Sequence, residues 1–126
     1  MRKKYIKMAK HNELGELGED LAVEELEKNG YEIVERNWRF KKAEIDIIAR
    51  KNEVLAIVEV KTRSSNYFGD PQDFVNPKKI KMLVEAVNEY VVSKDLDVEV
   101  RFDIIAIIIN QNKLTLEHLE DAFFHF

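Results

Sequence analysis

Four charged residues interrupt two otherwise apolar runs in the middle of the chain, and they are of types that serve metal-assisted chemistry. Glu44 and Asp46 lie in the first run, and Glu59 and Lys61 lie in the second. Because successive side chains of a strand point to opposite faces, each pair shares one face of its strand. Burying an unpaired carboxylate is costly, so charges in such positions normally form ion pairs, bind a metal ion or take part in catalysis. A functional site is therefore the leading hypothesis.

The length of the connection between the two runs decides whether these side chains meet. A two-residue hairpin loop at positions 52 and 53 places Asp46 opposite Glu59, with all four charged side chains on one face. A three-residue loop centred on Asn52 places Asp46 opposite Val58 and turns Glu59 to the other face. Both registers are open from the sequence.

Asp46, Glu59 and Lys61 would suit the hydrolysis of a phosphodiester. Magnesium prefers oxygen ligands and usually needs only one or two protein carboxylates besides water and substrate phosphate. A lysine on the same strand face as Glu59 could position or help deprotonate the attacking water and offset charge at phosphorus. The pattern is weak alone, and a cross-strand salt bridge between Glu44 and Lys61 on a solvated face is the structural alternative.

The composition indicates one compact intracellular domain. With 126 residues, of which 45% are hydrophobic, residues 1–126 suit a single domain. Cysteine is absent, which excludes disulfides and thiolate metal sites and permits a reducing cytoplasm. The basic segment from Met1 to Lys10 lacks the apolar core of a signal peptide, and the apolar run Ile104 to Ile109 is too short to cross a bilayer. We therefore expect a cytoplasmic protein that does not contact a membrane.

Charge is unevenly distributed along the chain, although the formal total is only -4. Residues 36–81 carry eleven Lys/Arg and six acidic residues, and residues 1–11 carry five Lys/Arg and no acidic residue. Residues 12–35 carry one Lys against nine acidic residues, and residues 82–126 carry three Lys/Arg against nine. An anionic polymer bound to one face would suit this distribution, and an ordinary mixed-charge surface is the alternative.

Local patterns predict an α-β-β-β-α-β order with a short final segment. A capped helix with an apolar stripe is expected over residues 12–30, and an Asn76-Pro77 start announces a second helix that ends near Ser93. Strands are expected over residues 31–37, 44–50, 54–63 and 98–109, with a long surface loop over 64–75, a turn at 110–112 and a short segment over 114–116. Lysines in the first turn of the second helix oppose its dipole, which is easier to understand if an anion docks nearby.

Several ordered motifs make the chain resemble the YraN family. They are Gly15-Glu16-Leu17-Gly18-Glu19-Asp20-Leu21-Ala22, Gly30-Tyr31, Arg36-Asn37-Trp38-Arg39, Glu44-Ile45-Asp46-Ile47-Ile48-Ala49, Val58-Glu59-Val60-Lys61-Thr62-Arg63, Gly69, Val75, Lys79 and Arg101-Phe102-Asp103. That family is similar to the PD-(D/E)xK nucleases, especially the archaeal Holliday junction resolvases. The resemblance runs from about Gly15 to Ile107, and Ala43 departs from it because the family usually has glycine there.

The resemblance implies a single restriction-endonuclease-like α/β domain with a mixed central sheet and assigns roles to residues of this chain. Asp46, Glu59 and the Val60 carbonyl would hold Mg²⁺ or Mn²⁺, and Lys61 would be the catalytic lysine. Glu19 would complete the catalytic set, although by itself it reads as one more charge on an acidic helix.

The same resemblance implies residues around this centre. Glu44 would be an auxiliary residue. Arg39, Arg63 and Lys79 would contact DNA, and plain surface charge is the alternative interpretation of Arg63 and Lys79.

We therefore expect a metal-dependent endonuclease that cuts structured or branched DNA, by analogy with resolvases as a homodimer. A DNA-binding or adaptor module with this fold and little hydrolysis is the competing hypothesis. His11, His118 and His125 have no metal-ligand spacing, so we expect them at the surface or in the tail. Core or loop packing is expected for Trp38, Phe40, Tyr67 and Phe68 rather than base stacking. The glycines lack the setting of a phosphate-binding loop.

Overall fold

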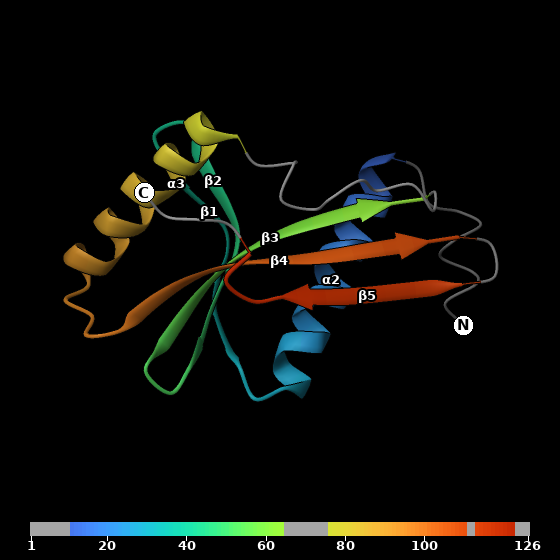
Figure 1. Cartoon of the computed structure of the whole chain (residues 1–126), viewed down its shortest axis with the longest axis horizontal. Helices are drawn as coiled ribbons and strands as arrows, with labels where there is room; N and C mark the ends of the chain where they lie inside the picture. Colours follow the sequence, from blue (N-terminus) through green and yellow to red (C-terminus); the bar gives the residue numbers. More distant parts are fainter. Residues whose placement is uncertain (1–10, 65–75, 111–112, 123–126) are drawn as a thin grey trace.

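The computed structural model describes residues 11–64, 76–110 and 113–122, which form two helices and a five-stranded sheet (Figure 1). The elements in chain order are α2 (His11–Lys28), β1 (Glu32–Phe40), β2 (Ala43–Lys51), β3 (Val54–Arg63), α3 (Pro77–Ser93), β4 (Glu99–Ile109) and β5 (Leu114–Leu119). The predicted α-β-β-β-α-β order is confirmed. The segment expected over 114–116 is a full edge strand, and the first strand continues past Asn37 to Phe40.

The sheet is mixed, as expected. Its strands lie in the order β1-β2-β3-β4-β5, with β3 and β4 parallel and the other neighbours antiparallel. The parallel pair requires a crossover, and the chain from β3 to β4 provides it through α3. The predicted α/β class is therefore confirmed.

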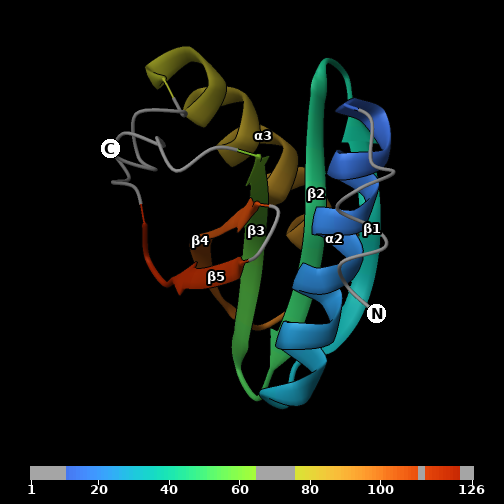
Figure 2. The ribbon, with the colours of Figure 1, turned by 90° about the vertical axis from the view of Figure 1, so that its right-hand side faces the viewer.

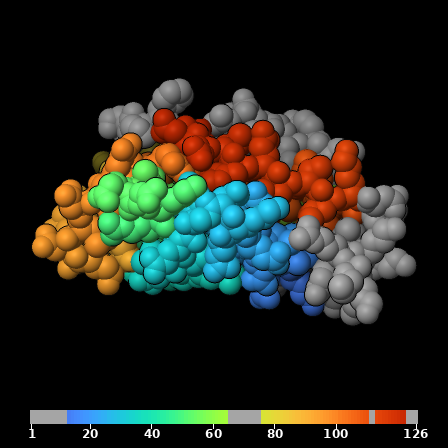
Figure 3. Space-filling model, turned by 90° about the horizontal axis from the view of Figure 1, so that it is seen from below, coloured from blue at the N-terminus to red at the C-terminus, as the bar shows by residue number. Residues whose placement is uncertain are grey.

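The two helices pack on opposite faces of the sheet, so the sheet has an apolar core on each side (Figures 1 and 2). The core under α3 contains Ile80, Leu83 and Tyr90. The core under α2 contains Leu21 and Leu26. In Figure 3, α2 forms an outer layer that lies beside β5. Neither helix in the described part of the chain combines the length and apolar character needed to cross a bilayer.

The hairpin between β2 and β3 has the two-residue turn that was one of the two predictions. Lys51 pairs with Val54, and Asn52 adopts a φ of 55°, a left-handed conformation that asparagine tolerates. The ladder continues to Ile47 and Val58, the last pair before the positions of Asp46 and Glu59. The two-residue turn and its register are therefore confirmed as far as Ile47 and Val58, whereas the expected pairings of Asp46 with Glu59 and of Glu44 with Lys61 are not part of the ladder.

Beyond the Ile47–Val58 pair, β2 and β3 are no longer paired with each other. Strand β2 continues along β1, whereas β3 continues along β4 to Arg63, and Figure 1 shows β3 to β5 leaving β1 and β2 at this level. Ile45 packs in the core under α3 and Ile47 in the core under α2, although residues two apart in a regular strand share a face. The backbone of β2 therefore rotates at Asp46. Asn37, at the same level of β1, has a φ of 52°.

The start of α3 follows the sequence prediction. Asn76 caps the helix by accepting a hydrogen bond from the Lys79 backbone N–H at 2.8 Å, and Pro77 occupies the first turn. The cap fixes where the Lys79 backbone begins the helix.

One of the two predictions for aromatic side chains can be compared with the structure. Trp38 and Phe40 stack with ring centroids 6.3 Å apart and pack against the core under α3, as expected. Tyr67 and Phe68, with most of the loop over 64–75, lie outside the described residues.

The surface prediction for His118 is wrong. Only 12% of its side chain is exposed, and its Nε2 lies 2.8 Å from Oδ2 of Asp103. The Asp103 carboxylate is fully buried and also accepts hydrogen bonds from Arg101 and from the Asp121 backbone N–H. The prediction rested on the spacing of residues close together in sequence, whereas Asp103, the partner of His118, lies on the neighbouring strand β4. The side chains of His11 and His125 lie outside the described part.

Candidate functional site

The candidate site lies where β2 and β3 separate, between the first turns of α2 and α3. Two pockets meet there, and both are lined by Asp46 and Glu59. The pocket toward α2 has a volume of about 260 Å³ and is lined by Leu14, Gly15, Glu19, Asp46, Glu59, Val60, Lys61, Thr62 and Arg63. Glu19, Asp46, Glu59 and Lys61, the four predicted catalytic residues, are thus brought together.

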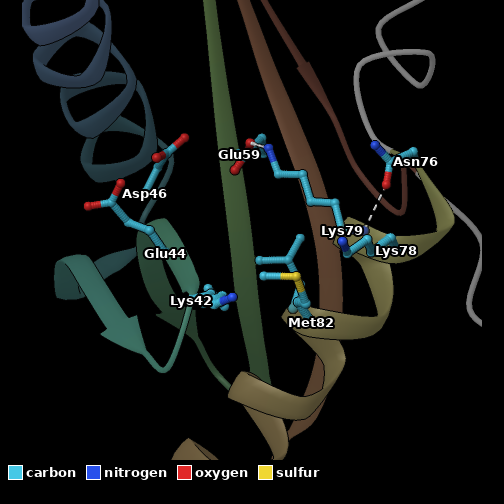
Figure 4. Close-up of a pocket in the computed structure, with 10 residues that line it drawn as sticks. Lys42, Glu44, Asp46, Glu59, Asn76, Lys78, Lys79 and Met82 are labelled. Atoms are coloured by element: carbon cyan, nitrogen blue, oxygen red, sulfur yellow. Dashed lines mark hydrogen bonds and ion pairs between the residues drawn. The ribbon is translucent and has the colours of Figure 1, made fainter.

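The second pocket, shown in Figure 4, opens toward α3 and has a volume of about 360 Å³. Its lining residues are Lys42, Ala43, Glu44, Asp46, Glu59, Asn76, Lys78, Lys79, Met82 and Leu83. Acidic side chains from β2 and β3 therefore face lysines from α3 and from the turn before β2. The pairing of opposite charges across an open pocket is suited to an anionic ligand that brings its own cation.

Asp46 carries the largest electrostatic perturbation of the site. Its Oδ2 accepts a hydrogen bond from the Val60 backbone N–H at 2.8 Å. Burial, and then the negative charge of Glu59, raise the pKa of Asp46 to about 7, with a smaller contribution from Glu19. The Val60 hydrogen bond and the charge of Lys79 oppose this rise in pKa. Crowded carboxylates of this kind are typical of sites that bind a cation or hold a proton.

Glu59 is buried beside two ammonium groups. Its side chain is only 8% exposed, Lys61 Nζ lies 3.5 Å from its Oε2, and Lys79 Nζ contacts the same oxygen. Lys61 comes from the same strand and Lys79 from α3. Lys79, expected as a contact for DNA, thus lies within the site in this structure.

Glu19 reaches the site because α2 approaches β3 closely at Gly18. A Cβ atom placed on Gly18 would lie 1.8 Å from Oγ1 of Thr62, so no side chain fits between helix and strand. Glu19 itself lies 3.7 Å from Arg36 and forms a hydrogen bond with Asn37. Burial raises the pKa of Glu19, and the Asn37 hydrogen bond and Arg36 oppose that effect.

Of the remaining predicted residues, Glu44 lines the pocket toward α3, Arg63 lines the pocket toward α2, and Arg39 lines neither pocket. Glu44 and Lys61, the two residues of the alternative cross-strand salt bridge, pair in the structure with Arg39 and Glu59 respectively. Arg39 Nε lies 3.2 Å from Glu44 Oε2 and the arginine is well exposed. Arg63 is exposed and donates a hydrogen bond to the Thr62 carbonyl oxygen at 2.9 Å.

Sequence reasoning missed several residues of the site. Asn37 and Arg36, which hold Glu19, and Thr62, which receives Gly18, were not assigned roles. A glycine inside an amphipathic helix was the available signal for the close helix–strand contact. Ala43, where the resembling family usually has glycine, is buried in the core under α3, so its methyl group has room.

The oxygen atoms present would suit a hard cation with few protein ligands. Within the described residues, no set of three or more His, Cys, Asp or Glu side chains gathers as a metal-binding group. Asp46 and Glu59 offer two carboxylates. Val60, which lies between Glu59 and Lys61 in the sequence, offers one backbone carbonyl. Mg²⁺ commonly binds through one or two carboxylates and keeps several waters, so this donor set fits Mg²⁺ or Mn²⁺.

Comparison with known proteins identifies the family. Residues 18–107 match the family described as "Uncharacterised protein family UPF0102", which covers more than half of the chain. The chain belongs to the UPF0102 family. UPF0102 is the family that the sequence resembles as YraN, so that prediction is confirmed, and Glu19, Asp46, Glu59 and Lys61 all fall within the matched range.

Close relatives within UPF0102 match along nearly their whole length. The UPF0102 protein FP2501 of Flavobacterium psychrophilum is 65% identical over 119 residues, which cover 94% of this chain and 100% of the relative. The UPF0102 protein BF0634 of Bacteroides fragilis is 49% identical over 117 residues, covering 93% and 97% of the two chains. The UPF0102 protein of Bacteroides thetaiotaomicron is 47% identical over the same length.

Proposed function

We propose that this UPF0102 protein is a metal-dependent endonuclease that hydrolyses phosphodiester bonds in structured or branched DNA. Its core would be of the PD-(D/E)xK type, similar to archaeal Holliday junction resolvases. The observation that carries the proposal is that Glu19, Asp46, Glu59, Val60 and Lys61 line one pocket. These residues come from a helix and two strands, and their convergence is what the sequence resemblance requires.

The charge balance of the pocket supports a bound divalent cation. Burial, and then repulsion from the negative charge of Glu59, raise the pKa of Asp46 to about 7, and a bound cation would offset both effects. Asp46, Glu59 and the Val60 carbonyl would hold Mg²⁺ or Mn²⁺. When bound, such an ion supplies positive charge that favours deprotonation of water and neutralises a scissile phosphate.

The protein's own side chains would bind and orient the substrate. Lys61, whose Nζ lies 3.5 Å from Glu59 Oε2, would orient a water molecule and offset negative charge on the phosphate. Arg39 and Arg63 are exposed, and they would contact neighbouring phosphates of the DNA backbone. Contacts of this kind hold DNA without reading its sequence, which agrees with a preference for DNA structure.

A DNA-binding or adaptor module is the second candidate, and one observation favours it. Glu59 already has two lysine partners, and the described residues hold no group of three or more ready metal-ligating side chains. A site neutralised by lysines could bind a phosphate without cutting it. Fold alone does not decide between these candidates.

Cleavage assays separate the two candidates. Purified protein is incubated with labelled four-way junction, flap and linear duplex DNA in the presence of Mg²⁺, Mn²⁺ or EDTA. We expect metal-dependent cleavage of the branched substrates, loss of cleavage in Asp46→Ala and Lys61→Ala, and retention in Glu53→Ala, which alters an acidic residue in the exposed β2–β3 turn.

Two outcomes would count against the nuclease, and a third would count against its preference for branched DNA. Cleavage that persists in both site variants would indicate a contaminating enzyme. Binding without cleavage under every metal condition would favour the adaptor. Equal cleavage of linear and branched DNA would remove the structural preference. The homodimer predicted from the resemblance can be measured on the same samples by light scattering, with and without junction DNA.

A further inference from the structure

Lys79, a lysine of α3, forms an ion pair with the carboxylate of Glu59, which is proposed to hold a metal ion. Lys79 Nζ contacts Oε2 of Glu59, and Lys61 Nζ lies 3.5 Å from the same oxygen atom. Figure 4 shows the Lys79 side chain extending from the first turn of α3 toward Glu59. The carboxylate is 8% exposed, so little of its charge is screened by water.

The backbone of Lys79 is fixed, whereas its side chain has room to move. Asn76 accepts a hydrogen bond from the Lys79 backbone N–H at 2.8 Å and so anchors the first turn of α3. The side chain of Lys79 is 34% exposed and borders the 360 Å³ pocket. Lysine carries its charge on a flexible four-carbon stem. Its ammonium group can therefore leave Glu59 for the pocket while the helix stays in place.

A divalent cation and the Lys79 ammonium group cannot both occupy the same oxygen of Glu59. Each is attracted by the same carboxylate, and each repels the other. Lys61 differs, because it lies on the same strand as Glu59 and at a greater distance from Oε2. Lys79 is the partner that competes most directly with a cation.

We propose that Lys79 is a resident counter-ion of the site: it neutralises Glu59 when no divalent cation is bound, is displaced when one binds, and then turns to a phosphate of DNA. The proposal rests on the proposed function and adds a device that couples metal binding to DNA binding. Without DNA, displaced Lys79 loses its partner and metal binding is weak. With DNA, a phosphate replaces Glu59 as that partner, so each ligand strengthens binding of the other.

The test measures Mn²⁺ binding to the full-length protein in the absence of DNA, by titration followed by electron paramagnetic resonance of free Mn²⁺. Lys79→Met removes the competing charge and keeps an extended side chain. Lys81→Met removes the same charge from an exposed position in the same helix turn and serves as the matched control. We expect Lys79→Met to bind Mn²⁺ at least about fivefold more tightly than the parent, and Lys81→Met to stay within about twofold.

A second measurement examines the coupling. A non-cleavable DNA junction should raise the Mn²⁺ affinity of the parent, and this gain should be much smaller in Lys79→Met. Lys79→Arg retains the charge and should bind Mn²⁺ as weakly as the parent. This measurement on the parent alone also tests the proposal if Lys79→Met does not fold, because an affinity that is the same with and without DNA would overturn the coupling.

The outcomes distinguish this proposal from the nuclease itself. Equal Mn²⁺ affinity in the parent and Lys79→Met would overturn the counter-ion role and leave the nuclease intact. Tighter Mn²⁺ binding in Lys79→Met without cleavage of any DNA by the parent would support the counter-ion role and refute the nuclease. Failure of all proteins to bind Mn²⁺ would overturn both.

Discussion

Replacing Asp46 with asparagine should stabilise the metal-free protein at alkaline pH. The asparagine side chain keeps an oxygen that can accept the Val60 N–H hydrogen bond now made by Asp46 Oδ2 at 2.8 Å. It removes the negative charge that burial and Glu59 oppose. The variant therefore changes the electrostatics of the site and leaves its hydrogen bond in place.

The magnitude follows from the pKa of Asp46 in the folded and unfolded states. A carboxyl group whose pKa rises from 3.8 to about 7 on folding corresponds to roughly 4 kcal/mol at a pH above both values. Because Asp46 keeps some contact with solvent, which screens its charge, we expect on the order of 2 kcal/mol. A raised pKa favours folding while the group is protonated. Its contribution is thus complete below pH 3.8 and is lost as the pH rises through about 7.

The assay is urea denaturation in EDTA at pH 4, 6 and 8, for the parent, Asp46→Asn and the control Asp97→Asn. We expect parent and Asp46→Asn to be nearly equal at pH 4 and the variant to be more stable at pH 8. Asp97→Asn removes the same charge from an exposed position and should change the free energy of unfolding by less than about 0.5 kcal/mol. A variant that is less stable than the parent at pH 8, or a difference that does not change with pH, would refute the electrostatic reasoning.

Addition of a divalent cation should reverse that order. Mn²⁺ at saturating concentration should raise the melting temperature of the parent by mass action and leave Asp46→Asn almost unchanged, since the variant lacks one proposed ligand. An equal rise in both proteins would mean that the ion binds elsewhere.

Two further substitutions test contacts that shape the site, and a third tests the buried Asp103 cluster. Gly18→Ala should destabilise the protein by about 1–3 kcal/mol in urea denaturation, because its methyl group would overlap Thr62, and Thr62→Ala in the same chain should restore part of the loss. Asn76→Ala removes the α3 cap and should cost about 1 kcal/mol, measured by thermal denaturation. Asp103→Asn should be strongly destabilising at neutral pH. Burial raises the pKa of Asp103, but the hydrogen bonds that it accepts from His118, Arg101 and the Asp121 backbone outweigh burial and lower the pKa overall. That contribution is present above pH 3.8 and is lost as the pH falls through the lowered value, so the deficit of Asp103→Asn should shrink in acid. A deficit that stays constant down to pH 2 would contradict this assignment.

The element order was predictable because it rests on residues close together in sequence, which also limited the β2–β3 hairpin to two registers. The sequence left open a two-residue or a three-residue turn, and in the structure Asn52 adopts a left-handed conformation that asparagine tolerates. An Asn-Pro pair specifies a helix start, and Asn76 does cap α3. Local signals of this kind predict the structure well because the hydrogen bonds of the turn or cap are formed between residues that are only a few positions apart.

The contacts that complete the site depend on residues distant in sequence. Lys79 and Glu59 are joined only after the chain has crossed from β3 to α3, and no local pattern specifies that approach. The rotation of β2 at Asp46 likewise appears only when Ile45 and Ile47 enter cores on opposite faces of the sheet. His118 and Asp103 meet across neighbouring strands, and the charge pair could not be read from either strand alone.

The separation of β2 and β3 gives Asp46 two roles that one substitution can confuse. Where the hairpin ladder ends, the Val60 N–H donates a hydrogen bond to the Asp46 side chain. This carboxylate therefore links β2 to β3 at the point where they separate, and it also faces the pocket. Asp46→Ala would leave that part-buried N–H without its acceptor, which costs up to about 1–3 kcal/mol, the range for a fully buried donor. Loss of cleavage in Asp46→Ala alone could then result from a wider separation of β2 and β3 rather than from the missing charge. Loss in Asp46→Asn, which preserves an acceptor oxygen, would point to the missing charge, and for that reason the asparagine variant is the stronger test of a cation ligand.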